Sequence, residues 1–527
     1  MPSSSISPSS DVIVVGAGHN GLVAAVLLAR AGLRVSVLEE KSIVGGACKT
    51  ERPFARAPHL AASTGAYLLG LMPPELVAKL GVEIPWIRRD PHYFLPTTGS
   101  RHLLFGSDGA AMEQQFMRFF SARDWKAHST MQAELALLRE DLAPTWLDEP
   151  LSIEETAERH VRAPLRAAFV DLCRRPVWDY LARFDFKSDL LRAMYAVTDG
   201  FSGLSGPWDT PGTGMNFLIH NMCRLPGSDG TFMLVRGGMG TVTSRIADAA
   251  RQAGALIETG RRVDRIVVDR GTVRGVALQD GSEVRAPVVV CNADPFRMRD
   301  LVGRAVLPQD YDRRIDSYAR DGATLKVNLA MRALPRFTCL AGSANEGRGP
   351  FGPTIHLLPD EANVLADLGR GFAEAQAGRL PDFPTIEWYV HSTLDPTLDD
   401  GARSLQSGAL FVQSVPYALS GGRSWDTEED RYVKHLLAIC DRFAPGTSEC
   451  VVDTFVLTPP KIEKHFGITR GHIHHVDNSF GFADRLPYRT PVAGLYSCSA
   501  GTHPAGSVIG CAGHNAAMRV LGDLGRA

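Results

Sequence analysis

The feature that most restricts the fold of this chain is a glycine-rich turn between a strand and a helix near the N-terminus. The apolar run at residues 11–15 (DVIVV) predicts a buried parallel strand, and residues 16–21 (GAGHNG) follow it directly. Apolar residues then recur at helical spacing over 22–30, up to Gly32, and residues 35–38 (VSVL) predict a second strand. This order of strand, turn, helix and strand is the context in which GxGxxG binds a dinucleotide.

The residues of the turn have separate parts in dinucleotide binding. Gly16 allows the tight turn, Gly18 lets a pyrophosphate approach the backbone, and Gly21 lets the helix pack on the sheet. His19 and Asn20 lie where the helix is expected to start, and its unpaired N–H groups and partial positive charge attract a phosphate. The turn by itself does not show whether the dinucleotide is FAD or NAD.

A carboxylate at the end of the second strand completes the pattern. Glu39 closes that strand, where it can hold the ribose hydroxyls of a dinucleotide. Glu40 competes for this role, but neighbouring side chains of a strand point to opposite faces, so one of the two serves and we favour Glu39. Gly45 and Gly46 would let another backbone segment approach the cofactor closely.

Sequence patterns typical of a nucleotide-binding domain occur twice more, later in the chain. A second α/β passage begins at Gly237, and the last sixty residues end in a strand, a Gly-rich turn and a helix. Between these regions, residues 92–105 predict a hairpin and residues 198–211 predict a loop. The expected fold class is α/β: a discontinuous Rossmann-like nucleotide-binding domain with an inserted α+β substrate domain, made of a mixed sheet and helices. The predicted boundaries are 1–75, 228–300 and 465–527 for the nucleotide-binding domain, and 76–227 and 301–464 for the substrate domain.

Charge and cysteine usage restrict the partners and the compartment. The sequence has 56 Lys and Arg and 58 Asp and Glu, which gives a net charge of −2. This balance lacks the excess of positive charge that is typical of proteins that bind nucleic acid. The nine cysteines are scattered and contain no CxxC, which favours a reducing, cytoplasmic setting over a disulfide framework. The polar N-terminal tail does not resemble a signal peptide. No apolar run reaches the roughly 18 residues of a membrane span, and peripheral membrane contact stays open.

Several motifs resemble those of a known superfamily. Residues 11–46 are similar to the FAD-binding start of flavin amine oxidases and phytoene desaturases. The runs at 236–240 (RGGMG) and 290–295 (VCNADP) resemble the phytoene desaturase family, and residues 494–506 and 510–517 resemble its C-terminal flavin motif. The resemblance extends over essentially the whole chain. It is closest for the branch that contains pyridine nucleotide-disulphide oxidoreductase domain-containing protein 2.

This resemblance implies that the cofactor is FAD. It assigns Val263 to the adenine. A further group of residues is implied around the ribityl chain and isoalloxazine: Gly501, Thr502, Val508, Ile509 and Gly510. A C-terminal helix starting near Ile509 would direct its positive end toward the flavin N1–C2=O edge, which becomes negative on reduction.

The function implied is hydride transfer from a substrate C–H to flavin N5, in the manner of a dehydrogenase or desaturase. The substrate class implied is apolar and isoprenoid- or lipid-like. The sequence does not identify the electron acceptor, for which oxygen and a quinone are candidates. A flavin-dependent, non-redox carotenoid-type isomerase and a non-catalytic protein stabilised by FAD are the alternatives.

Histidines are the candidate acid–base residues. His220 lies between the predicted domains and His503 lies inside the flavin motif, so both are candidates to face the substrate. His472, His474 and His475 form a local cluster, and the first two would share one face of a strand. Further metal ligands are not identified, so we expect a polar loop there and no metal.

Overall fold

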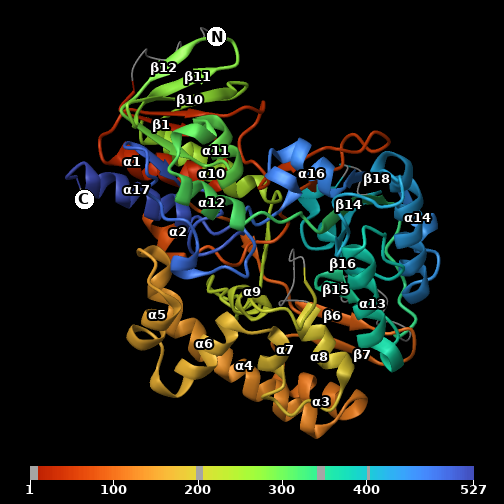
Figure 1. Ribbon diagram of the computed structural model, residues 1–527. Coiled ribbons are helices and arrows are strands. Elements are labelled where there is room, and N and C mark those ends of the chain that lie inside the picture. The colour runs from red at the N-terminus through yellow and green to blue at the C-terminus, as the bar shows by residue number, and fades with distance from the viewer. Residues whose placement is uncertain (1–9, 198–205, 341–350, 400, 402–403, 527) are drawn as a thin grey trace.

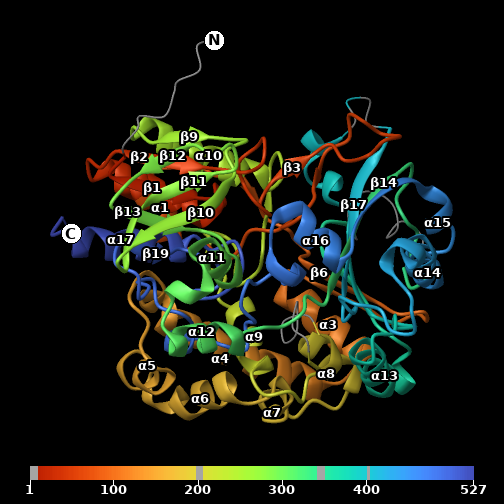
Figure 2. The ribbon, with the colours of Figure 1, turned by 45° about the horizontal axis from the view of Figure 1, so that its top comes forward.

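The structure is a computed structural model that describes residues 10–197, 206–340, 351–399, 401 and 404–526. Figure 1 shows three regions: a layered unit that contains the N- and C-terminal segments, a second sheet beside it, and a group of helices below both. The view in Figure 2 shows the same arrangement from another direction, with the layered unit and the second sheet facing each other. Segments far apart in the sequence therefore meet between these regions.

A parallel sheet forms the centre of the layered unit. In the described chain it has five strands in the order β19-β13-β1-β2-β9, and every neighbouring pair is parallel. The strands are β1 (Val12–Val15), β2 (Val35–Leu38), β9 (Leu256–Glu258), β13 (Val288–Cys291) and β19 (Leu495–Ser497). Residues 12–15 are all buried, as expected of a parallel strand covered on both faces.

Different layers cover the two faces of this sheet. Val12 and Val14 face a helical layer, whereas Ile13 belongs to the cluster on the opposite face. The helical layer consists of α1 (His19–Arg30), α10 (Gly240–Gln252) and α17 (Cys511–Asp523). The opposite layer consists of the antiparallel strands β10 (Val263–Asp269), β11 (Thr272–Leu278) and β12 (Glu283–Arg285), with α11 (Pro295–Val302) and α12 (Gln309–Ser317). These layers close the apolar core around the glycine-rich turn.

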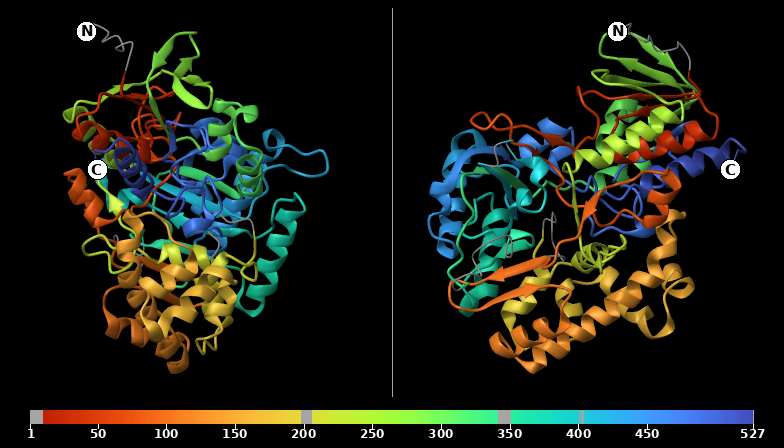
Figure 3. Two further views of the ribbon diagram at one scale, coloured as in Figure 1. Left: turned by 60° about the vertical axis from the view of Figure 1, so that its left-hand side comes forward. Right: turned by 180° about the vertical axis from the view of Figure 1, so that it is seen from behind.

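The second sheet is mixed. Its order among the described strands is β18-β14-β17-β16-β15-β6-β7, with one parallel pair between β15 and β6. In chain order these strands are β6 (Tyr93–Pro96), β7 (His102–Phe105), β14 (Thr324–Met331), β15 (Thr354–Leu357), β16 (Thr385–Tyr389), β17 (Gln406–Gln413) and β18 (Val451–Leu457). The helix α14 (Trp425–Phe443) packs on its outer face, and α13 (Val364–Gln376) and α16 (Pro459–Phe466) lie nearby (Figure 3).

The two faces of the second sheet differ in chemistry. On β16, Ile386 and Trp388 belong to the apolar cluster shared with α14. Glu387 and Tyr389 alternate with them, so they lie on the opposite face and are still buried. A buried polar face must be satisfied by its own hydrogen bonds or by a ligand.

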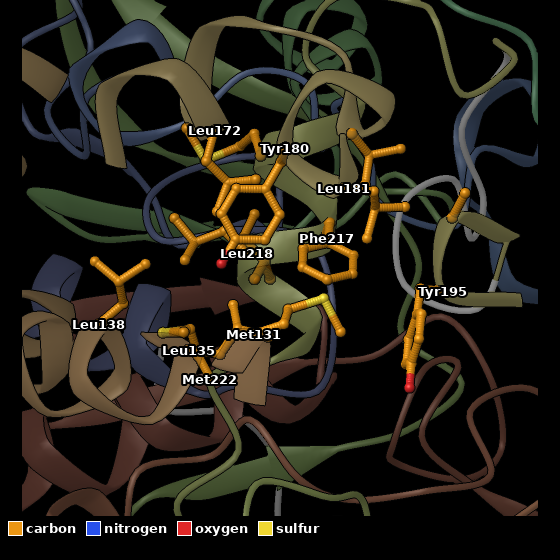
Figure 4. Packing of buried hydrophobic residues seen from close by; sticks show 14 of the residues in the cluster. Met131, Leu135, Leu138, Leu172, Tyr180, Leu181, Tyr195, Phe217, Leu218 and Met222 are labelled. Atoms are coloured by element: carbon orange, nitrogen blue, oxygen red, sulfur yellow. The ribbon is translucent and has the colours of Figure 1, made fainter. Parts of the chain in front are cut away.

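Helices cover the remaining side of the molecule. They are α3 (Gly109–Phe119), α4 (Ala122–Leu142), α5 (Ile153–Arg159), α6 (Arg166–Arg174), α7 (Val177–Leu181), α8 (Asp189–Tyr195) and α9 (Thr213–His220). Figure 4 shows how Leu135 and Leu138 pack with Phe217 and Tyr180 in their shared core. Tyr195 stands at the edge of this core, and its hydroxyl contacts His128 Nδ1 at 2.6 Å.

The described chain also contains smaller strands and α-helices. They are β3 (Thr50–Glu51), β4 (Ala62–Ser63), β5 (Trp86–Ile87), β8 (Leu234–Val235), α2 (Pro74–Leu80) and α15 (Thr447–Cys450). The pair β3–β4 and the pair β5–β8 are both antiparallel.

The predicted α/β class, with a Rossmann-like sheet and a mixed second sheet, is confirmed. The hairpin expected at 92–105 is formed by β6 and β7. Residues 472–475 form a turn, stabilised by the bond from His475 N to His472 O, which agrees with the polar loop expected for this histidine cluster and not with a strand. Of the loop expected at 198–211, residues 198–205 lie outside the described residues.

The contact between α1 and α17 yields a stability prediction. An added Cβ at Gly513 of α17 would overlap the Asn20 carbonyl oxygen of α1, whereas an added Cβ at Gly522 of the same helix meets nothing within 4 Å. Gly513→Ala should therefore cost about 1–3 kcal/mol of unfolding free energy, because backbone must move to relieve the overlap. Gly522→Ala should be neutral or slightly stabilising, since Ala is the better helix former. Thermal unfolding of both variants checks this, and equal melting temperatures would contradict the packing described.

Candidate functional site

A cavity of about 600 Å³ joins the glycine-rich turn to the polar face of the second sheet. Gly16 and Gly18 line one part of it, and Lys326, Glu387 and Tyr389 line another. A volume of this size is typical of cofactor and substrate sites. The cavity therefore brings together segments that the sequence separates by more than 300 residues.

The glycine-rich turn is shaped as a dinucleotide site requires. Gly16 has a φ of +96°, in the left-handed region that favours glycine. An added Cβ at Gly18 would lie 2.7 Å from Asn292 Nδ2, and one at Gly21 would overlap the carbonyl oxygen of Gly16. No side chain caps the N-terminus of α1, whose cap residue is Gly18, so the N–H groups of its first turn are available to a phosphate.

Glu39 and Glu40 occupy different electrostatic environments. Glu39 is 6% exposed, and its carboxylate accepts hydrogen bonds from Ala17 N at 2.8 Å and Lys41 N at 2.9 Å. Burial raises the pKa of Glu39 despite these bonds. Burial would also raise the pKa of Glu40, but its ion pairs with Arg297 and Lys41 hold that pKa below its usual value. The preference for Glu39 over Glu40 as the ribose ligand remains a prediction.

The residues around the turn fit a bound dinucleotide. The buried Asn20 Oδ1 has no hydrogen-bond partner within the described residues. The backbone at Gly45 also packs against the glycine-rich turn, because Gly45 N donates to Ala17 O at 2.8 Å. Of the predicted cofactor residues, the cavity is lined by Gly16, Gly18, His19, Asn20, Glu39, Glu40, Gly45, Gly46, Val263 and Val508.

The C-terminal flavin segment contributes less to the wall than the resemblance implies. Besides Gly21, the predicted residues outside the lining are Gly501, Thr502, Ile509 and Gly510. The helix α17 starts at Cys511, two residues later than expected, because Gly510 has a φ of +83° and forms its N-cap. Val508 alone of the implied flavin group lines the cavity, just before this helix.

The two candidate catalytic histidines lie in different places. His220 lines the cavity at the end of α9, and its Nδ1 donates to Asn216 O at 3.0 Å, so Nε2 is the free acceptor. Burial lowers the pKa of His220, which favours the neutral ring. His503 does not line the cavity: it is 1% exposed, its Nε2 contacts Thr145 O at 3.1 Å, and its ring packs on Phe482. The structure therefore gives His503 no contact with a ligand in this cavity.

Glu387 forms a buried cluster that the sequence analysis missed. Its Oε1 accepts from Gln413 Nε2 at 2.6 Å, and its Oε2 accepts from the hydroxyls of Tyr67, at 3.3 Å, and Tyr389. Burial raises the pKa of Glu387 to about 7, against the lowering effect of these donors. A carboxyl group of this kind exchanges protons near neutral pH.

Lys326 connects the second sheet to the N-terminal segment. Its Nζ donates to the carbonyl oxygens of Ser63 and Gly65, each at 2.6 Å, and lies 4.4 Å from the ring centroid of Tyr67. Complete burial lowers the pKa of Lys326 well below its usual value. The sequence offered a signal for both groups, because Lys326 and Glu387 are the ionisable residues of two largely apolar strands.

Other cavity residues were seen in the sequence but not assigned to the site. Asn292 belongs to the VCNADP motif and lies against the glycine-rich turn. His474 and His475 line the cavity as well, although the cluster was expected to be an ordinary polar loop. Their contribution depends on tertiary packing, which local spacing does not encode.

Neither thiol chemistry nor a metal is indicated by the residues described. The nine cysteines are free, and burial raises the pKa of Cys48 to about 12, which makes it a poor nucleophile. No group of three or more His, Cys, Asp and Glu side chains with metal-binding geometry occurs in the described ranges. No helix found in them is long and apolar enough to cross a membrane.

Comparison with known proteins agrees with this fold. Residues 14–74 match the model of the NAD(P)-binding Rossmann-like domain. The chain is similar in fold to a putrescine oxidase bound to putrescine, with a TM-score of 0.60, 17% identity and coverage of 98% and 99% of the two chains. It is also 26% identical to a limonene dehydrogenase subunit of Castellaniella defragrans, over 98% of this chain and 95% of that protein.

These features define an oxidoreductase of the flavin-dependent class, with FAD as its cofactor. The chain is 33% identical to pyridine nucleotide-disulfide oxidoreductase domain-containing protein 2 of Mus musculus, over 98% of this chain and 94% of that protein. It therefore belongs to the family of that protein, as its motifs suggested.

The Glu387 cluster predicts a pH dependence of stability. The pKa of Glu387 is about 7 in the folded protein, against an ordinary value of 4.5. Between these values the folded state holds a proton that the unfolded state has released, so stability falls as pH rises through this window. Glu387→Gln should remove this contribution, and its melting temperature should fall less than that of the wild type from about pH 5 to about pH 7.

A matched control is Glu83→Gln, which changes an exposed carboxylate. It should keep the wild-type dependence on pH. Parallel curves for the wild type and Glu387→Gln would show that Glu387 has no elevated pKa.

Proposed function

We propose that this chain is an FAD-dependent dehydrogenase that takes a hydride from a C–H bond of an organic substrate. The single observation that carries the proposal is the continuous cavity from the dinucleotide turn to the polar face of the second sheet. Such a cavity can hold a cofactor at one part and a substrate at the other. FAD supplies hydride acceptance when bound, and the protein supplies orientation, electrostatics and a dry site.

The glycine-rich turn is assigned to the pyrophosphate and Glu39 to the ribose. Asn292 and Val508 border the same part of the cavity and would limit how the cofactor lies. His220, at the end of α9, offers a neutral ring nitrogen to the cavity, and Glu387, on the second sheet, offers a carboxyl group that can change protonation. We assign both groups to the handling of protons on the substrate side.

A largely apolar substrate body, isoprenoid- or lipid-like, is part of the proposal. The helices contribute Met112, Trp125 and Met194 to the wall, and the second sheet contributes Phe411. The related protein from Castellaniella defragrans is named for limonene, which is an isoprenoid. We expect oxygen or a quinone to accept the electrons.

The cofactor assignment is tested by the affinity for FAD. Glu39→Gln should weaken FAD binding by about 10–100-fold, because charge-assisted hydrogen bonds to the ribose would be lost. Glu40→Gln should have a smaller effect, since that carboxylate is already paired with Arg297 and Lys41. Flavin fluorescence titration of the apoprotein measures both, with circular dichroism to verify folding. Wild-type affinity in folded Glu39→Gln would contradict the assignment.

The reaction class is tested under anaerobic conditions. Isoprenoid and lipid-like compounds that are substrates should bleach the flavin and lose two hydrogens, as measured by mass spectrometry of the product. A product of unchanged mass would instead identify an isomerase. Photoreduced flavin that neither oxygen, a quinone nor a dye reoxidises would point to the non-catalytic alternative.

A further inference from the structure

Arg89 is a buried guanidinium in the wall of the cavity. The residue is 5% exposed and follows β5. Its Nε donates to Phe232 O at 2.9 Å and its Nη1 donates to Thr354 Oγ1 at 2.8 Å. Both acceptors are neutral, and Nη2 has no acceptor among the residues described.

The carboxyl group of Glu387, which acts on the charge of Arg89, is already engaged. Both oxygens of Glu387 accept hydrogen bonds from Tyr67, Tyr389 and Gln413, and none from Arg89. Arg89 influences Glu387 only through its charge. No carboxylate in the described parts of the chain forms an ion pair with Arg89.

A second buried arginine shows what a structural role looks like in this protein. Arg485 is 1% exposed, and all three of its nitrogens donate to acceptors of nearby turns. Arg485 does not line the cavity, whereas Arg89 does. Arg89 therefore differs in having unused donors and access to a ligand.

An unpaired buried charge is costly, so proteins pair such groups with counter-ions. A guanidinium binds a planar carboxylate through two parallel N–H···O bonds. We propose that Arg89 binds the carboxylate of a substrate whose remaining body is apolar. This inference rests on the proposed function and refines it: the substrate is an acid with a lipid-like chain.

The surroundings of Arg89 favour a carboxylate over a phosphate. Glu387 lies near enough to interact electrostatically with Arg89, and it would repel a dianion more than a monoanion. The other buried cation of this wall, Lys326, already donates to two carbonyl oxygens. Aromatic side chains of Tyr93 and Phe232 border the same cavity and suit the apolar chain beyond the carboxylate.

The experiment compares three probes with one chain and different ends: oleate, oleyl alcohol and oleyl phosphate. Binding to the full-length holoprotein is followed by the flavin spectrum and by intrinsic tryptophan fluorescence, to which Trp125 in the cavity wall contributes. We expect oleate to bind at least tenfold more tightly than either other probe. Arg89→Gln should remove this preference, with oleyl alcohol bound as before.

The neighbouring arginine provides a matched control. Arg88 is more exposed and paired with Asp229, so Arg88→Gln should keep the preference for oleate. Arg89→Lys retains the charge and should keep part of the preference, which tests the proposal if Arg89→Gln does not fold. Wild-type protein that binds the three probes equally, or oleyl phosphate most tightly, would overturn the carboxylate assignment. So would an unchanged preference in folded Arg89→Gln.

The flavin content separates this inference from the proposed function. Arg89→Gln should retain FAD, because Arg89 is not assigned to the cofactor. A wild-type protein without flavin that still prefers oleate in an Arg89-dependent manner would refute the dehydrogenase and retain the acid-binding site. A flavoprotein with no preference for oleate would retain the proposed dehydrogenase and refute the acid-binding site.

Discussion

The close packing of backbone around the glycine-rich turn is the constraint on which the rest of the site depends. Gly16 turns the chain with a positive φ, and Gly21 leaves no room for a side chain against the Gly16 carbonyl. Gly45 N then bonds to Ala17 O and brings a third backbone segment alongside. These contacts open one end of a parallel sheet to a ligand, in the manner typical of dinucleotide sites.

The second sheet completes the cavity at an energetic cost. Its outer face is apolar and packs on α14, but its inner face buries Lys326 and Glu387. Burying ionisable groups opposes folding unless hydrogen bonds compensate, and both groups are bonded within the protein. Arg89 is less completely compensated, which is why a ligand is expected there. A wall of this composition is better explained by binding than by stability.

Local sequence patterns predicted the first part of this arrangement. The turn, α1 and the position of Glu39 follow from contacts within the first forty residues, which the fingerprint specifies. The start of α17 was misplaced by two residues, because a left-handed glycine delays it. His503 was singled out from its motif, but packing places its ring outside the cavity.

The opposite wall of the cavity was not predictable in the same way. Alternation along β16 indicates two faces, yet it does not say which face meets the N-terminal segment. That depends on pairings between strands from residues 93 to 457, and on contacts such as Lys326 with Ser63. Ionisable residues inside largely apolar strands were the available signal, and they identify Glu387 and Lys326 once the sheet is known.

The most direct test of the central claim is the visible absorption spectrum of the purified wild-type protein, recorded before and after denaturation. The account predicts the two bands of an oxidised flavin, with the chromophore released into solution on denaturation, because backbone and ribose contacts hold it without a covalent bond. A colourless protein that remains colourless after addition of FAD would contradict the account, since the cavity would then lack the cofactor on which the proposed chemistry depends.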